Sequence, residues 1–196
     1  ILCAVVTLLL MPAFAGVTER AEFKYENGFL DYRFSVLLEG ASQTVYEVMT
    51  DYDRLDRLNN RIHESRVLSR YGPHSLKRLL EMEYCVLRFC FKLTFVETVE
   101  ETANTITATI VPEESNFKKG FVQWHIVPVG KSHTRLEVRA KQAPDFWIPP
   151  IIGPAILKRL FLQEIRDAVT NLEHVVKKLP QSNHETQKQS RPSFLK

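Results

Sequence analysis

The sequence predicts an α+β domain: a curved antiparallel sheet of about seven strands, two short helices after the first strand, and one long C-terminal helix. Three observations predict it. Apolar and polar residues alternate in seven segments between residues 29 and 141, which is typical of strands with one buried face. Short turns join most of these segments, which favours antiparallel pairing. From residue 153 onward, apolar residues recur every three or four positions, as on one face of a helix.

The first predicted strand begins at Phe29 and stops at Gly40. Ser42 is a suitable N-cap for a short helix that follows. Asp51 or Asp53 can cap a second short helix that ends near Leu58. Six more strands are predicted at residues 62–71, 76–84, 91–99, 105–111, 120–127 and 134–141.

The last predicted element is an amphipathic helix that starts at Gly153-Pro154 and ends before Pro180. Proline is tolerated in a first turn because its missing N–H has no helical partner there. The helix is about 40 Å long at 1.5 Å per residue. Residues 180–196 are polar and lack periodicity, so we expect a disordered tail.

The composition is that of one globular domain with short extensions. The chain has 196 residues, of which 44% are hydrophobic and 25% charged. The formal net charge is +3, and Lys and Arg are spread along the chain among Asp and Glu. This distribution argues against a nucleic-acid-binding protein.

Residues 1–15 carry no charge and contain an apolar run followed by Ala13-Phe14-Ala15. This pattern predicts a secretory signal peptide over residues 1–15, with its basic n-region missing. The alternative is an uncleaved membrane anchor, although the run is shorter than the roughly 20 residues that span a bilayer. We expect an N-terminal lead-in segment at residues 16–28, before the folded domain at residues 29–179. The sequence has no Asn-x-Ser/Thr sequon, which favours the periplasm or cell envelope of a bacterium.

Three segments carry a family resemblance. Residues 41–55 contain an apolar-patterned helix and then Asp51-Tyr52-Asp53-Arg54-Leu55. Residues 120–128 read Gly-x-x-x-Trp-x-Ile-x-Pro and are followed by Thr134-Arg135-Leu136. Residues 146–154 read Phe-Trp-Ile-Pro-Pro-x-Ile-Gly-Pro. In this order they resemble the START-like (SRPBCC) superfamily, in its polyketide cyclase and coenzyme Q-binding START branch. The resemblance covers about residues 29–178. Where that family often has an apolar-Pro step, this chain reads Leu58-Asn59-Asn60, which leaves the packing of the second helix open.

The resemblance implies a helix-grip fold, in which the sheet wraps around the last helix and leaves a cavity between them. The alternation suggests which side chains line it. They are Leu80, Met82, Phe95, Ile106, Ile110, Trp124, Ile126, Leu136, Val138, Ile156, Leu160 and Ile165. An apolar cavity suits a lipid, a quinone or a polycyclic molecule. The alternative is that these side chains fill a tight core. No cofactor is expected.

The segment 143–152 holds large apolar residues between Pro144, Pro149 and Pro150. Prolines favour an extended loop, so these side chains either cap the cavity, contact a membrane surface or pack on the last helix. The helix-grip fold that the resemblance implies would place this loop at the same end as the tip of the hairpin that carries Cys85 and Cys90. The residues expected at the cavity mouth are Val86, Leu87, Phe89, Phe146, Trp147 and Ile148.

Two cysteines remain after removal of the signal, Cys85 and Cys90. At a hairpin, positions five apart can face each other, so in an exported protein we predict a disulfide. The alternative is two unpaired cysteines. The spacing is not that of a redox Cys-x-x-Cys motif, and no nearby residue completes a metal site.

No catalytic motif is present. The six histidines form no His-Glu-x-x-His pattern, and there is no Gly-x-Ser-x-Gly or P-loop. We therefore expect an exported protein that binds or transfers an apolar small molecule, with transient membrane contact and no nucleic-acid partner. Two alternatives stay open. One is a cyclase or aromatase-like enzyme on polyketide-type substrates, indicated by polar groups such as Tyr84 or Arg88 turned inward. The other is an interaction module with a filled core.

Overall fold

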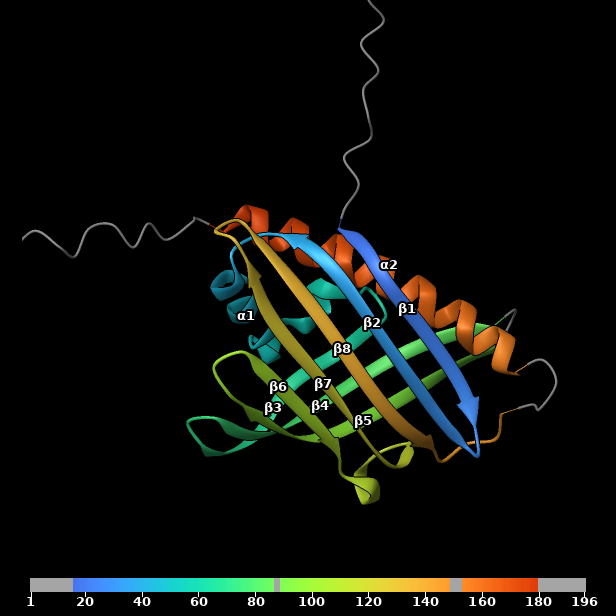
Figure 1. The fold of residues 1–196 in the computed structure, drawn as a ribbon. Helices are drawn as coiled ribbons and strands as arrows, with labels where there is room; N and C mark the ends of the chain where they lie inside the picture. Colours follow the sequence, from blue (N-terminus) through green and yellow to red (C-terminus); the bar gives the residue numbers. More distant parts are fainter. Residues whose placement is uncertain (1–15, 87–88, 149–152, 180–196) are drawn as a thin grey trace, which may run out of the picture.

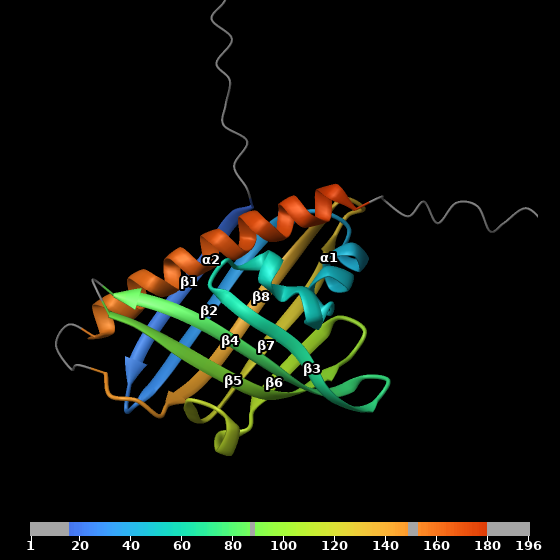
Figure 2. The ribbon, with the colours of Figure 1, turned by 180° about the vertical axis from the view of Figure 1, so that it is seen from behind.

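The computed structural model describes residues 16–86, 89–148 and 153–179. They form one eight-stranded antiparallel sheet in the order β1-β2-β8-β7-β6-β5-β4-β3 (Figure 1). The long helix lies across its concave side (Figure 2). The elements are β1 (Val17–Glu26), β2 (Phe29–Glu39), α1 (Ser42–Met49), η1 (Tyr52–Leu58), β3 (Ile62–Gly72), β4 (Ser75–Val86), β5 (Phe89–Glu101), β6 (Thr105–Ile110), η2 (Pro112–Glu114), β7 (Phe117–Val129), β8 (His133–Pro144) and α2 (Gly153–Lys178).

The predicted fold class is confirmed, but the sheet has eight strands instead of about seven. The additional strand is β1, which pairs along its length with β2. The two strands are joined by Asn27-Gly28, with φ values of 53° and 77°. Positive φ at both positions is the requirement of a type I′ hairpin turn, for which Asn-Gly is the preferred pair. β1 is an edge strand whose side chains are exposed up to Glu22, and from Phe23 onward half-buried and exposed side chains alternate. This period-two pattern is present in the sequence Ala21-Glu22-Phe23-Lys24-Tyr25-Glu26, within the segment predicted as a lead-in.

Two tyrosines fasten the short helices to the sheet. Tyr46 of α1 and Tyr52 of η1 both donate hydrogen bonds to the Glu101 carboxylate at the end of β5, at 2.7 and 2.8 Å. Burial, followed by the bond to Glu101, raises the pKa of Tyr46 to about 12, so the phenol stays a donor. The helices are thereby held over one end of the curved sheet.

The packed core lies at that same end. It joins Val45 and Val48 of α1 to the sheet and to the C-terminal half of α2. The buried residues of α2 after Gly153 are Ile165, Val169, Leu172, Glu173 and Val176. Residues 154–164 of the same helix contribute no fully buried side chain. The first half of α2 therefore faces space that the core does not fill.

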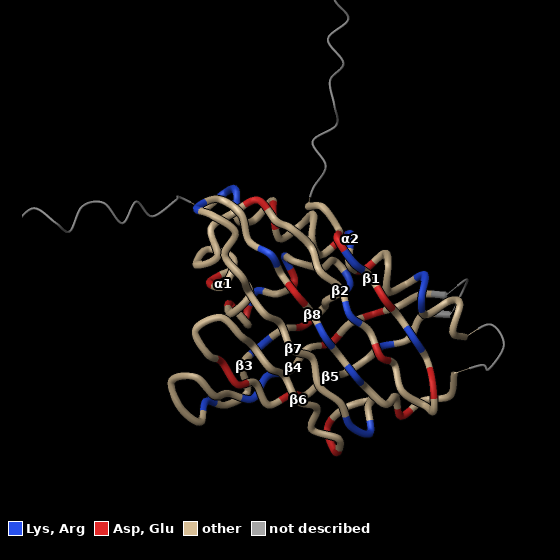
Figure 3. The backbone as a smooth tube through the Cα atoms, viewed as in Figure 1, with Lys and Arg blue, Asp and Glu red and all other residues tan. Residues whose placement is uncertain are grey.

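The convex face of the sheet carries charges of both signs. Lys and Arg alternate with Asp and Glu along β1, β2 and β8 (Figure 3). Several are cross-strand pairs, such as Arg135 with Glu19 at 2.8 Å. Among the described residues, no helix is both long enough and apolar enough to cross a membrane.

Candidate functional site

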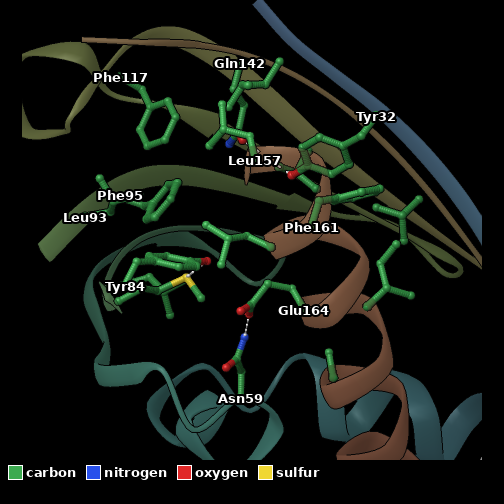
Figure 4. Close-up of a pocket in the computed structure, with 18 of the residues that line it drawn as sticks. Tyr32, Asn59, Tyr84, Leu93, Phe95, Phe117, Gln142, Leu157, Phe161 and Glu164 are labelled. Carbon is green, nitrogen blue, oxygen red and sulfur yellow. Dashed lines mark hydrogen bonds between the residues drawn. The ribbon is translucent and has the colours of Figure 1, made fainter. Parts of the chain in front are cut away.

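A cavity of about 340 Å³ lies between the concave side of the sheet and the first half of α2. Figure 4 shows Phe95, Phe117 and Phe161 among the side chains around it. Its lining is Phe23, Leu30, Tyr32, Phe34, Asn59, Arg78, Leu80, Met82, Tyr84, Phe91, Leu93, Phe95, Glu97, Phe117, Val122, Trp124, Val138, Gln142, Phe146, Leu157, Leu160, Phe161, Glu164, Ile165 and Ala168. The volume is in the range of small-molecule sites.

A second hollow of about 450 Å³ adjoins this cavity. The two share five lining residues, namely Phe91, Leu93, Phe146, Leu157 and Leu160. The second hollow is also bounded by Trp147, Ile148 and the start of α2. This second hollow lies at the end of the molecule opposite the core. We call it the outer hollow, and we call the first cavity the inner cavity.

The structure distributes the twelve predicted lining residues over four places. The inner cavity takes Leu80, Met82, Phe95, Trp124, Val138, Leu160 and Ile165. Ile156 lines the outer hollow. Ile106, Ile126 and Leu136 belong to the packed core, and Ile110 is buried outside both hollows. Alternation assigns a side chain to a face of the sheet, but it does not tell how far along the strand the cavity extends.

The predicted mouth residues Phe146, Trp147 and Ile148 all line the outer hollow. Ile148 is buried, whereas Trp147 is 78% exposed. Phe91 lines both hollows and is 38% exposed. Leu87 and the side chains of Val86 and Phe89 lie outside the described part of the chain.

Cys85 and Cys90 lie opposite each other near the tip of the β4–β5 hairpin. Their sulfur atoms are 2.03 Å apart, the length of a disulfide bond. Arg88, which we considered as an inward polar group, lies outside the described residues.

Three polar groups interrupt the apolar lining of the inner cavity, and the first is an ion pair. Arg78 on β4 and Glu97 on β5 are directly opposite in the register, with Nη2 and Oε2 2.7 Å apart. Their side chains are only 6% and 3% exposed. Sequence reasoning missed this pair, although Arg78 is in phase with the inward residues Leu76 and Leu80.

The second polar group joins β2 to β8. The Tyr32 hydroxyl donates to Oε1 of Gln142 at 3.4 Å. Burial raises the pKa of Tyr32 well above its ordinary value, so the phenol remains protonated.

The third polar group comprises Asn59, Arg61, Tyr84 and Glu164, from four parts of the chain, and we call it the Glu164 cluster. The Asn59 amide donates to Oε2 of Glu164, while its carbonyl oxygen accepts the Arg61 N–H at 2.9 Å. Nε of Arg61 contacts Oε1 of Glu164, and the Arg61 guanidinium lies 5.3 Å from the centre of the Tyr84 ring. Burial raises the pKa of Glu164 above its ordinary value. The Asn59 that departs from the family pattern therefore ties the end of η1 to α2.

The described residues contain no group of three or more His, Cys, Asp or Glu that could hold a metal ion. The side chains that line the inner cavity offer hydrogen-bonding groups within an apolar enclosure.

The family model for "Polyketide cyclase / dehydrase and lipid transport" matches residues 31–177, most of the chain. The chain belongs to this family. No curated protein matches the sequence.

Solved structures of START-like proteins share the fold of this chain. A START superfamily protein from Mycobacterium smegmatis is 20% identical with a TM-score of 0.61, over 76% of this chain and 97% of that one. The Zhui aromatase/cyclase from Streptomyces sp. R1128 is 12% identical with a TM-score of 0.61, over 75% and 93%. A STAR-related lipid transfer protein from Xanthomonas axonopodis is 14% identical with a TM-score of 0.56, over 78% and 98%.

At these identities the likeness shows the fold alone. The chain is thus a START-like, helix-grip protein of the polyketide cyclase and lipid transport family, as the resemblance implied. The family match begins within β2 and ends within α2, so β1 lies outside the matched range.

Proposed function

We propose that this chain is an exported protein that binds or transfers one apolar small molecule, such as a lipid, a quinone or a polycyclic compound. The observation that carries the proposal is the inner cavity, whose lining is apolar except for three polar groups. Burial of about 300 Å² of apolar ligand surface would release on the order of 7 kcal/mol before the costs of association. That is sufficient for binding without any chemical step.

The outer hollow supports exchange of the ligand at a membrane surface. Trp147 projects from it with 78% of its surface exposed, and Lys92 lines the same hollow. An exposed indole prefers the interface between water and lipid, and a lysine favours anionic headgroups. We propose that this end of the molecule contacts a membrane transiently while the ligand enters or leaves.

Export is proposed from two features of the sequence. Residues 1–15 have the composition of a secretory signal. Cys85 and Cys90 form a pair at bonding distance, and disulfides persist mainly in oxidising compartments. We propose the periplasm or cell envelope of a bacterium as the location.

The test is native mass spectrometry of the exported protein, followed by organic extraction and mass analysis of what is released. We expect a bound apolar molecule whose mass identifies its class. A protein that carries nothing after gentle preparation, and that binds no added lipid or quinone, would contradict the proposal.

The Glu164 cluster favours a second candidate function, an enzyme of the cyclase or aromatase type. Tyr84 and Glu164 both line the inner cavity, and burial raises the pKa of Glu164, which suits a general acid. We place this candidate second because the other charged groups of the inner cavity, Arg78 and Glu97, hydrogen-bond to each other. They therefore offer no free acid, base or cation to assist Glu164 in a reaction. Conversion of a bound polyketide-type compound during incubation, lost in Glu164→Gln, would reverse this order.

A further inference from the structure

The three polar groups of the inner cavity differ in how many hydrogen bonds remain available. Arg78 donates twice to Glu97, and Tyr32 donates to Gln142. The Tyr84 hydroxyl, by contrast, donates only to the Met82 sulfur, at 3.8 Å. A thioether is a weak acceptor, so the Tyr84 phenol is a buried donor without a strong partner.

Glu164 is the complementary acceptor. Its Oε1 contacts Nε of Arg61, but neither atom makes an aligned hydrogen bond. The Glu164 side chain is 17% exposed. Tyr84 and Glu164 both line the inner cavity. In Figure 4 the Tyr84 hydroxyl and the Glu164 carboxylate point into the same part of the cavity.

The charges around the inner cavity are already balanced. Among its described lining residues the one cation is Arg78, which is paired with Glu97, and Arg61 behind the wall is paired with Glu164. A buried carboxylate or phosphate of a ligand would find no unpaired cation there, and an uncompensated buried charge is strongly unfavourable. The lining carboxylates Glu97 and Glu164 each face an arginine, so a cationic ligand group would find no unpaired carboxylate either. We expect the polar end of the ligand to be uncharged.

We propose that the Glu164 cluster binds the hydroxyl group of a neutral, otherwise apolar ligand. The ligand oxygen accepts a hydrogen bond from Tyr84 and donates one to Glu164, while Asn59 and Arg61 hold the carboxylate in place. A hydroxyl fits because it is both donor and acceptor. It would accept from the weakly partnered Tyr84 phenol and donate to Oε2 of Glu164, which has a lone pair left beside the bond from Asn59. This inference rests on the proposed function and names the ligand class within it.

The experiment compares three fluorescent probes that share one ring system: 1-pyrenemethanol, 1-methylpyrene and 1-pyrenecarboxylate. Each is titrated into the delipidated full domain and into Tyr84→Phe, which removes only the hydroxyl. We expect Tyr84→Phe to weaken binding of the alcohol about fivefold, the worth of one hydrogen bond, and to leave 1-methylpyrene unchanged. The carboxylate should bind more weakly than the alcohol to the unmodified protein.

Tyr32→Phe is the matched control, since it removes a phenol of the same cavity that already has a partner in Gln142. It should leave the ratio of the alcohol and methyl affinities unchanged. Glu164→Gln is the second variant, used with circular dichroism to verify folding. Glu164→Gln should weaken binding of 1-pyrenemethanol about threefold, because a hydrogen bond to a charged carboxylate is stronger than one to a neutral amide.

The outcomes separate this inference from the function on which it rests. If 1-methylpyrene and the alcohol bind but neither Tyr84→Phe nor Glu164→Gln changes their ratio, the hydroxyl site is overturned and the apolar-ligand function stands. If the carboxylate binds best, the neutral class is wrong. If no probe binds, the proposed function fails, and the inference fails with it.

Discussion

Glu97 and Glu164 both line the inner cavity, but the fold treats them differently. Glu97 accepts two hydrogen bonds from Arg78 on the neighbouring strand, and the Arg78 guanidinium also lies 5.3 Å from the Tyr52 ring and 5.5 Å from the Trp124 ring. Glu164 faces Arg61 without an aligned hydrogen bond. Burial makes the ionised form of this carboxylate unfavourable. A ligand hydroxyl that donates a hydrogen bond to it would stabilise the ionised form.

The raised pKa of Glu164 predicts how stability depends on pH. A carboxyl with a raised pKa binds its proton more tightly in the folded than in the unfolded state, so the free energy of unfolding falls as pH rises from the ordinary value of 4.5 through the folded value. Glu164→Gln removes this loss. We expect the variant without ligand to melt about 2 °C higher than the unmodified protein at pH 8.

The difference should shrink toward zero as the pH is lowered well below 4.5, where Glu164 is protonated in both states. Thermal melts followed by circular dichroism across this range measure it. A variant that is less stable than the unmodified protein at pH 8 would show that the Arg61 ion pair outweighs the burial of the carboxylate.

The Glu164 cluster illustrates what sequence patterns can and cannot predict about a site. The inward direction of Tyr84 follows from the alternation of β4. Asn59 and Glu164 are 105 positions apart, and nothing in the local pattern of either residue indicates the other. Their meeting depends on where η1 crosses α2, which is a property of the assembled fold.

At the scale of elements, the buried strands and the long helix were predictable because each has one apolar face. β1 was missed although Ala21, Phe23 and Tyr25 alternate with charged residues and the Asn27-Gly28 turn was a usable signal. The alternation covers only the second half of the strand, and the first half is exposed throughout. The extent of the cavity was not predictable either. Leu136 and Val138 are both inward residues of β8 and both pack in the core, yet only Val138 also lines the cavity.

Gly120 offers a test of how closely β7 and β8 must approach at the cavity. A Cβ at this position would lie 2.7 Å from Cα of Gln142 and 2.7 Å from the carbonyl oxygen of Lys141. Backbone atoms of a central strand cannot yield as a flexible side chain would. We therefore expect Gly120→Ala to lower the free energy of unfolding by about 2–3 kcal/mol, measured by urea denaturation.

Gly72→Ala is the control, because a Cβ there has no heavy atom within 4 Å. It should change stability by less than about 0.5 kcal/mol. Equal effects of the two substitutions would mean that β7 can move away from β8 without cost.

At the scale of the whole molecule, the packed core and the two hollows lie at opposite ends. The helices α1 and η1 and the second half of α2 close one end with a dense core. The first half of α2 and residues 146–148 border the two hollows at the other end. One end can therefore supply stability while the other remains open to a ligand, and a bound ligand would add stability in proportion to its affinity.

This arrangement of the core and the hollows predicts that only the end with the outer hollow contacts a membrane. Trp147→Ser should weaken partitioning onto vesicles of phosphatidylcholine and phosphatidylglycerol about five- to tenfold, because burial of an indole contributes roughly 1 kcal/mol or more. Tyr71→Ser is the matched control, since Tyr71 is also an aromatic residue with high exposure, 62%, but precedes the β3–β4 turn at the other end of β4. Vesicle co-sedimentation measures both variants. Equal partitioning of the two would mean that membrane contact is absent or uses another face, and that ligand exchange at the outer hollow does not depend on Trp147.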